Sequence, residues 1–169
     1  MEHPEQSGAP APERIILSSR KEYLDAFDRL AALVERELRI FDPDCFHLQI
    51  NSPHRCELLR AFLLRRRDNR LYMALHDTDY VRNNCPRFTS LLQQFSDRMF
   101  IHQTQGDAAR VQDCMVLADR LHFVRRPVQA QPRGTLWLHD DRESQGMYLR
   151  FSEIWESSFT AVSATTSGL

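Results

Sequence analysis

Three polar side chains, Gln112, Cys114 and Asp119, stand in the otherwise mostly apolar stretch VQDCMVLAD, residues 111–119. Side chains two apart on a β-strand point to the same face, so Gln112 and Cys114 are expected to lie side by side. Asp119 follows at the turn into the next apolar run. The residue types and spacing therefore raise the question of what chemistry these side chains could support together.

Two readings of these residues stay open. In the first, Cys114 is a nucleophile, which requires a lowered thiol pKa and a base such as His102 or His122. In the second, which we favour, Cys114 is a small buried hydrophobic residue and Gln112 hydrogen-bonds a neighbouring loop. Asp119 and Arg120 then form an ordinary turn between strands.

Metal and cofactor sites have little support in the sequence. The histidines closest in sequence, His47 and His54, flank an expected loop and helix start, and no H-x-x-x-H or Cys/His cluster appears. No glycine-rich phosphate loop enters a helix, so neither a dinucleotide nor acetyl-CoA is expected. The sequence therefore predicts no metal and no cofactor.

Composition indicates one globular domain in a chain of 169 residues with 42% hydrophobic and 27% charged residues. The net charge of −1 gives no support for broad nucleic-acid binding. Four cysteines without a C-x-x-C pair indicate reduced thiols, and the absence of a signal-like or membrane-spanning run favours a cytoplasmic protein. Polar composition predicts disordered tails at residues 1–13 and 159–169.

Arginines gather in two clusters that could contact an anion or a partner protein. The first cluster, at the end of an expected helix, contains Arg65, Arg66, Arg67 and Arg70. The second, near the end of an expected strand, contains Arg125, Arg126 and Arg133. If the sheet brings both to one edge, they could bind phosphate or an acidic protein surface. The alternative, which we favour, is a solvated helix end whose carbonyls the arginines satisfy.

Strands and helices alternate along most of the chain and then give way to three consecutive strands. Strands are expected at 14–19, 38–44, 70–76, 98–104, 111–118, 120–126 and 134–140, and helices after Ser19, after Ser52 and over 83–95, with a last helix from about 140. This pattern predicts an α/β fold with a mixed, mostly parallel sheet and helices on both faces. Val116, Val124 and Leu136 are expected in the core, with strand LYMALH, residues 71–76, near its centre.

The order of elements resembles one half of a phospholipase D-like fold over roughly residues 14–158, which we expect to be a single domain. That family carries H-x-K-x-x-x-x-D on a strand and its following turn. Residues 112–119, QDCMVLAD, match this spacing with Gln112 for the histidine, Cys114 for the lysine and Asp119 for the aspartate. The stretch YLRFSEIWESS, residues 148–158, also resembles the family's late F-x-x-x-W helix.

The resemblance implies a scaffold without the family's reaction, in which a shallow pocket around Gln112, Cys114 and Asp119 offers hydrogen bonds but little charge. The family's histidine attacks phosphorus and its lysine neutralises phosphate charge, whereas an amide is not nucleophilic and a thiol supplies no positive charge. We therefore expect a non-catalytic binding or regulatory domain. A phosphodiesterase-like or cysteine-dependent enzyme and a nucleic-acid-binding module remain alternatives. Single-half members often pair, which implies a homodimer, and similar bacterial domains attached to N-acetyltransferases imply such a partner protein.

Overall fold

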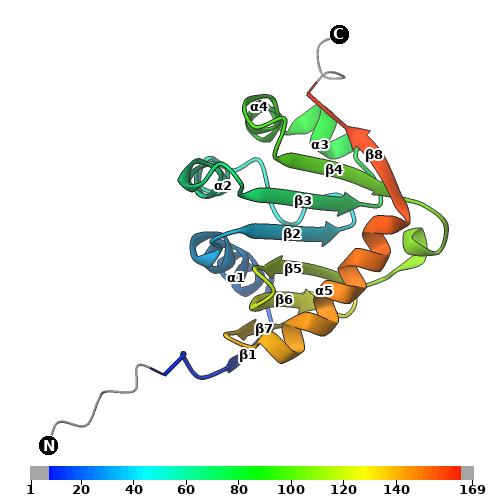
Figure 1. Ribbon diagram of the computed structural model, residues 1–169. Helices are drawn as coiled ribbons and strands as arrows, with labels where there is room; N and C mark the ends of the chain where they lie inside the picture. The colour runs from blue at the N-terminus through cyan, green and yellow to red at the C-terminus, as the bar shows by residue number, and fades with distance from the viewer. Residues whose placement is uncertain (1–7, 165–169) are drawn as a thin grey trace, which may run out of the picture.

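A single mixed sheet of eight strands forms the centre of the computed structural model, which describes residues 8–164 (Figure 1). The strands are β1 (Glu13–Leu17), β2 (Glu37–Asp42), β3 (Arg70–Leu75), β4 (Met99–Thr104), β5 (Cys114–Ala118), β6 (His122–Arg126), β7 (Gly134–Leu138) and β8 (Ser158–Val162). The helices are α1 (Arg20–Leu33), α2 (Pro53–Arg65), α3 (Asp79–Asn84), α4 (Pro86–Gln94) and α5 (Asp141–Glu156), with a 3-10 turn, η1, at Gly106–Arg110. The expected α/β fold with a mixed sheet is confirmed.

The strands follow the order β1-β7-β6-β5-β2-β3-β4-β8. Within residues 8–164, two of the seven pairings are parallel, β2 with β3 and β3 with β4, and the other five are antiparallel. The share of parallel pairs is therefore smaller than expected. A parallel neighbour needs a long crossover, usually a helix, and β5 follows β4 through η1 alone, so it runs back along β2.

Helix starts follow the expected capping residues. The Ser19 hydroxyl accepts a hydrogen bond from the backbone N–H of Glu22 at 3.1 Å, and the Ser52 hydroxyl accepts one from Arg55 at the same distance. One expected helix, over 83–95, is instead two, α3 and α4, because the chain leaves helical geometry at Cys85 (φ −122°, ψ 63°). Pro86 then opens α4, where its missing N–H costs nothing.

Two apolar layers cover the sheet. Helices α1, α2 and α4 pack on one face, and α5 crosses the other face diagonally (Figure 1). Val116, Val124 and Leu136 are all 2% exposed or less, as expected for core residues. Strand β3 lies between β2 and β4, so the expected interior position of residues 71–76 is also confirmed.

The two ends of the chain were expected to be disordered tails. Residues 1–7 and 165–169 lie outside the described residues, so the prediction of disorder there is not addressed. Residues 159–162, however, belong to β8, which pairs antiparallel with β4, so the expected tail is wrong over that stretch. An edge strand is half solvated and tolerates small polar residues such as Thr160, which hides it from a hydrophobicity pattern. No helix in the described chain is long and apolar enough to cross a bilayer.

Two glycines give a matched test of the packing. A Cβ added to Gly134 would lie 2.6 Å from the backbone oxygen of Arg125, whereas one added to Gly146 in α5 would meet nothing within 4 Å. We expect Gly134→Ala to lower the free energy of unfolding by about 1–3 kcal/mol through overpacking. Gly146→Ala should raise it by about 0.5–1 kcal/mol. Chemical denaturation measures both, and a Gly134→Ala protein as stable as the parent would contradict the close approach of β7 to β6.

Candidate functional site

The expected motif positions lie on β5 and on the residues just before and after it. Cys114 begins β5 beside the carboxyl ends of β2, β3 and β4, which we call the carboxyl edge, and Asp119 follows its other end beside Glu37, the first residue of β2. Five residues of extended chain separate positions 114 and 119 by about 16 Å. The structure therefore does not form the expected pocket around Gln112, Cys114 and Asp119.

Gln112 precedes β5 instead of lying on it. Its exposed side-chain amide donates a hydrogen bond to the backbone oxygen of Arg110 at 3.2 Å. Its own backbone oxygen accepts from the N–H of Gln129 at 2.9 Å. Gln112 thus ties together two loops, and its exposed side chain, unlike that of Cys114, is not part of the packed core.

Cys114 is fully buried on the face that packs against α1. Its Sγ accepts a hydrogen bond from Nε of Arg126 at 3.2 Å and lies 3.9 Å from the hydroxyl of Tyr23. Burial, together with the charge of Asp42, raises the pKa of the Cys114 thiol, although Arg126 acts in the opposite direction. The thiol is therefore protonated near neutral pH and is a poor nucleophile.

Arg126 is the centre of a buried polar group that also contains Tyr23, Asp42 and Cys114, here called the Arg126 cluster. The guanidinium carbon lies 4.5 Å from the centroid of the Tyr23 ring, and Nη2 lies 3.9 Å from Oδ1 of Asp42. Burial raises the pKa values of both Asp42 and Tyr23. Sequence reasoning missed Asp42, although an acidic residue that ends a buried strand was a usable signal.

Asp119 has a structural position. Its carboxylate accepts three backbone hydrogen bonds, from Glu35 and Arg36 at 2.7 Å each and from Glu37 at 3.0 Å. The residue adopts a left-handed conformation (φ 60°), which aspartate tolerates better than most residues. Asp119 therefore clamps the turn between β5 and β6 to the start of β2.

Asp113, which sequence reasoning also missed, holds two arginines at the carboxyl edge. Its buried carboxylate accepts from Nε of Arg125 at 2.9 Å and from Nη2 of Arg150 at 2.7 Å. The hydrogen bond to Asp113 raises the pKa of Arg150. The arginine side chains remain 34% and 40% exposed, so both guanidinium groups also face solvent.

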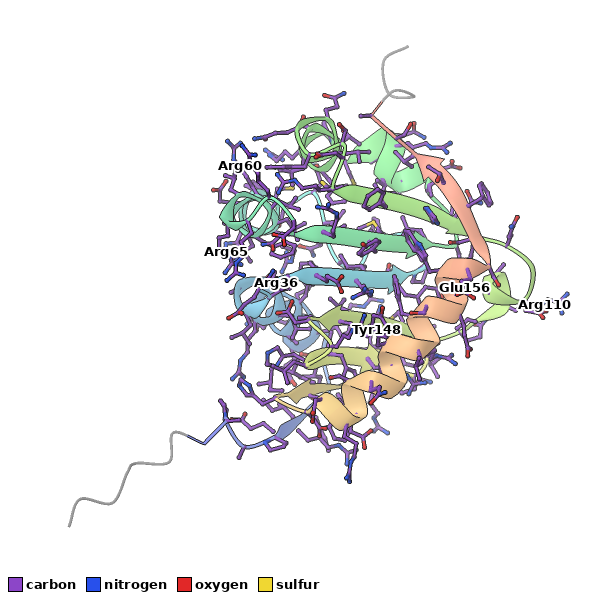
Figure 2. The ribbon with its side chains drawn as sticks, in the orientation of Figure 1. Arg36, Arg60, Arg65, Arg110, Tyr148 and Glu156 are labelled. Atoms are coloured by element: carbon purple, nitrogen blue, oxygen red, sulfur yellow. The ribbon has the colours of Figure 1, made fainter. Side chains whose placement is uncertain are left out.

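The two basic clusters do not meet. Arg65 donates to the backbone oxygen of Val34 and Arg70 donates to that of Arg67, at the edge where β3 begins. Arg125 and Arg126 end β6, which runs in the same direction as β3, so they lie at the opposite edge. Figure 2 places Arg36, Arg60 and Arg65 at one side of the molecule and Arg110 at the other. The condition for one anion site built from both clusters, a shared edge, is therefore not met.

The remaining expected residues are dispersed. Arg66, Arg67 and Arg133 are exposed, and His54 lies 3.8 Å from Asp28. His102 on β4 stacks on Trp155 at 3.6 Å, while His122 on β6 accepts a hydrogen bond from the N–H of His139, and three strands lie between the two histidines. Neither His102 nor His122 contacts Cys114. Over residues 8–164, no three His, Cys, Asp or Glu side chains are arranged to hold a metal ion.

The fold is that of the phospholipase D-like proteins. At a TM-score of 0.58 and 10% identity, the chain is similar to Nuc from Salmonella typhimurium, a phospholipase D family member, with 90% of this chain and 100% of that chain covered. The chain is also similar to NucT from Helicobacter pylori, at a TM-score of 0.61 and 7% identity, with 89% of this chain and 100% of that chain covered. A third similar structure is that of TrmBL2, an archaeal chromatin protein with a novel mode of DNA binding. Its TM-score is 0.66 at 10% identity, with 88% of this chain and 55% of that chain covered.

A family model covers most of the sequence. The model described as "Domain of unknown function (DUF7931)" matches residues 19–164, and the chain belongs to this family. No curated protein matches the chain. The chain spans about half the length of TrmBL2. At these identities, the likenesses to solved structures establish the fold alone.

The Asp119 clamp predicts a specific loss of stability. Asp119→Ala removes the acceptor of three backbone N–H groups and leaves alanine in a left-handed conformation, so the free energy of unfolding should fall by about 2 kcal/mol or more. Asp97→Ala is the matched control, because Asp97 is exposed and lies 3.9 Å from its one arginine neighbour. It should change stability by less than about 0.5 kcal/mol. Equal effects of the two substitutions in urea denaturation would contradict the clamp.

Proposed function

We propose that this chain is a non-catalytic binding domain on a phospholipase D-like scaffold. The observation that carries the proposal is the state of position 114, which aligns with the family's lysine. Cys114 is fully buried, and its sulfur accepts a hydrogen bond from Arg126. A phosphate group cannot reach this side chain without displacing the Arg126 cluster.

Phosphoryl transfer through a covalent intermediate needs a nucleophile and a cation at one place. The Gln112 amide is not a nucleophile, and it points to the backbone of Arg110. Arg126 is a cation near position 114, but it is 2% exposed and engaged with Cys114 and Asp42. A cysteine-dependent reaction has no better support, because burial raises the pKa of Cys114.

The carboxyl edge offers a surface for an anionic ligand. Arg125 and Arg150 share the carboxylate of Asp113, and Glu153 also acts on Arg150, so what this surface offers an anion is the N–H groups that Asp113 leaves free. Guanidinium groups held in place by a buried carboxylate are well suited to bind phosphate or carboxylate oxygens. We therefore propose an anionic group as the ligand of this edge.

Nucleic acid is the second candidate, because TrmBL2 is described as a DNA-binding chromatin protein. The net charge of −1 argues for a local contact with one or two phosphates and against a broad electrostatic footprint. The homodimer and the N-acetyltransferase partner that the resemblance implies stay predictions.

Catalysis is tested with bis(p-nitrophenyl) phosphate as the substrate. We expect no turnover by the parent protein, with or without divalent metal ions. Gln112→His should fold, since the position is exposed, and should also be inactive, because the new imidazole lies away from position 114. Parent activity that disappears in Gln112→Ala, in protein free of other nucleases, would overturn the proposal.

The anion contact is tested by titrating inorganic phosphate and, separately, a short single-stranded DNA while amide chemical shifts are recorded. Arg150→Gln should weaken phosphate binding several-fold, and Asp113 would keep Arg125 as its partner. Arg142→Gln is the matched control, an exposed arginine on the same helix. Shifts that ignore the carboxyl edge, or an equal loss in both variants, would contradict an anion site there. Tighter binding of DNA than of phosphate would favour the nucleic-acid candidate.

A further inference from the structure

A pocket of about 240 Å³ lies where α5 crosses β2 and β3, apart from Asp113, Arg125 and Arg150. Its lining combines aromatic rings with an arginine, a serine and a glutamate, namely Arg39, Tyr72, Tyr148, Phe151, Ser152, Trp155 and Glu156. Figure 2 shows Tyr148 and Glu156 on α5, in front of the sheet. Eight residues of helix separate these two side chains along the axis by about 12 Å.

Arg39 is fixed at one end of this pocket. Its guanidinium carbon lies 4.4 Å from the centroid of the Tyr148 ring and 5.1 Å from that of Tyr72, so the group is held between two aromatic rings. Nη1 pairs with Glu37 at 2.6 Å. Within residues 8–164, its other N–H groups have no hydrogen-bond partner. The Arg39 side chain is 9% exposed and lines the pocket in an orientation that the two rings fix, which lowers the entropy lost on binding.

The aromatic wall of the pocket is also held in place. Trp155 stacks on His102 at a centroid distance of 3.6 Å and meets the Tyr72 ring edge to face at 5.5 Å. Ser152 donates its hydroxyl hydrogen to the backbone oxygen of Tyr148, so it has no donor left for a ligand and can only accept. Glu156, which is exposed, is the one carboxylate among the residues that line this pocket, and so its strongest acceptor for a bound molecule.

These groups define the ligand by exclusion. A cation is disfavoured because the guanidinium of Arg39 already occupies the aromatic faces. A phosphate is disfavoured because Arg39, the one cation among the lining residues, already pairs with Glu37, and Glu156 adds a negative charge to the lining. The volume is below the roughly 300–1,000 Å³ of pockets for drug-sized ligands, so one small planar ring system fits better than a dinucleotide.

We propose that this pocket binds a guanine base. Guanine presents two acceptors, O6 and N7, that match the N–H edge of an arginine. Its N1–H and N2–H₂ donors lie on the neighbouring edge, where a carboxylate such as that of Glu156 accepts them. Adenine has an amino group in place of O6 and would direct a donor at Arg39. The site stands independently of the anion contact at the carboxyl edge.

Isothermal titration calorimetry with guanosine and adenosine tests the site in the full chain. Guanosine should bind at least about tenfold more tightly than adenosine, the discrimination expected of one bidentate arginine contact. A thymidine oligonucleotide with one central guanosine, compared with the same oligonucleotide carrying adenosine, distinguishes a base within single-stranded nucleic acid from a free nucleoside. Absence of guanosine preference in both arms would overturn the proposal.

Two variants separate recognition from folding. Glu156→Ala replaces an exposed helical residue and should weaken guanosine binding about tenfold while the circular dichroism spectrum is unchanged. Glu153→Ala is the matched control, an exposed glutamate one turn earlier that does not line this pocket. Arg39→Lys keeps the charge but loses the planar donor edge, and should abolish the preference for guanosine. Equal affinities of the parent and Glu156→Ala would overturn the assignment.

Discussion

A buried guanidinium is the constraint on which the carboxyl edge of this sheet depends. Moving a charge out of water is costly unless it is paired and hydrogen-bonded, and Arg126 meets that cost with a carboxylate, a sulfur and an aromatic ring. Its partners come from α1, β2 and β5, so the charge ties four elements together. Position 114 is coupled to position 126 for the same reason: a lysine at 114 would place a second cation beside the first without adding an anion.

All three motif positions, Gln112, Cys114 and Asp119, make contacts that stabilise the fold. Gln112 and Cys114 have taken structural contacts that leave no reactive atom free. Asp119 keeps the aspartate, and the structure gives a reason that needs no catalysis, because three backbone N–H groups at the start of β2 would otherwise lose their acceptor. An aspartate with this structural task is therefore no evidence of catalysis by itself.

Sequence patterns predicted what depends on local chemistry. Ser19 and Ser52 cap their helices, and Val116 and Val124 are buried, because capping and alternation act over a few residues. Strand direction was not predictable in the same way. The directions of β3 and β6 place Arg70 and Arg126 at opposite edges of the sheet. Strand direction depends on how all the strands are connected and paired, and a local sequence pattern does not contain that information. The pocket under α5 was missed for a related reason, since Arg39, Tyr72 and Tyr148 are distant in sequence and meet only when α5 packs on β2 and β3.

The order of strands in the sheet has a consequence for how the chain folds. Strands β2, β3 and β4 are neighbours in both sequence and space, so they can pair early. Strand β1 precedes all of them yet pairs only with β7, with Glu13 opposite Leu138. Contacts of such long sequence separation slow folding, because the entropy of closing the loop is lost before the contact forms. During synthesis, β1 therefore stays unpaired until β5, β6 and β7, the strands that lie between it and β2 in the sheet, have been made.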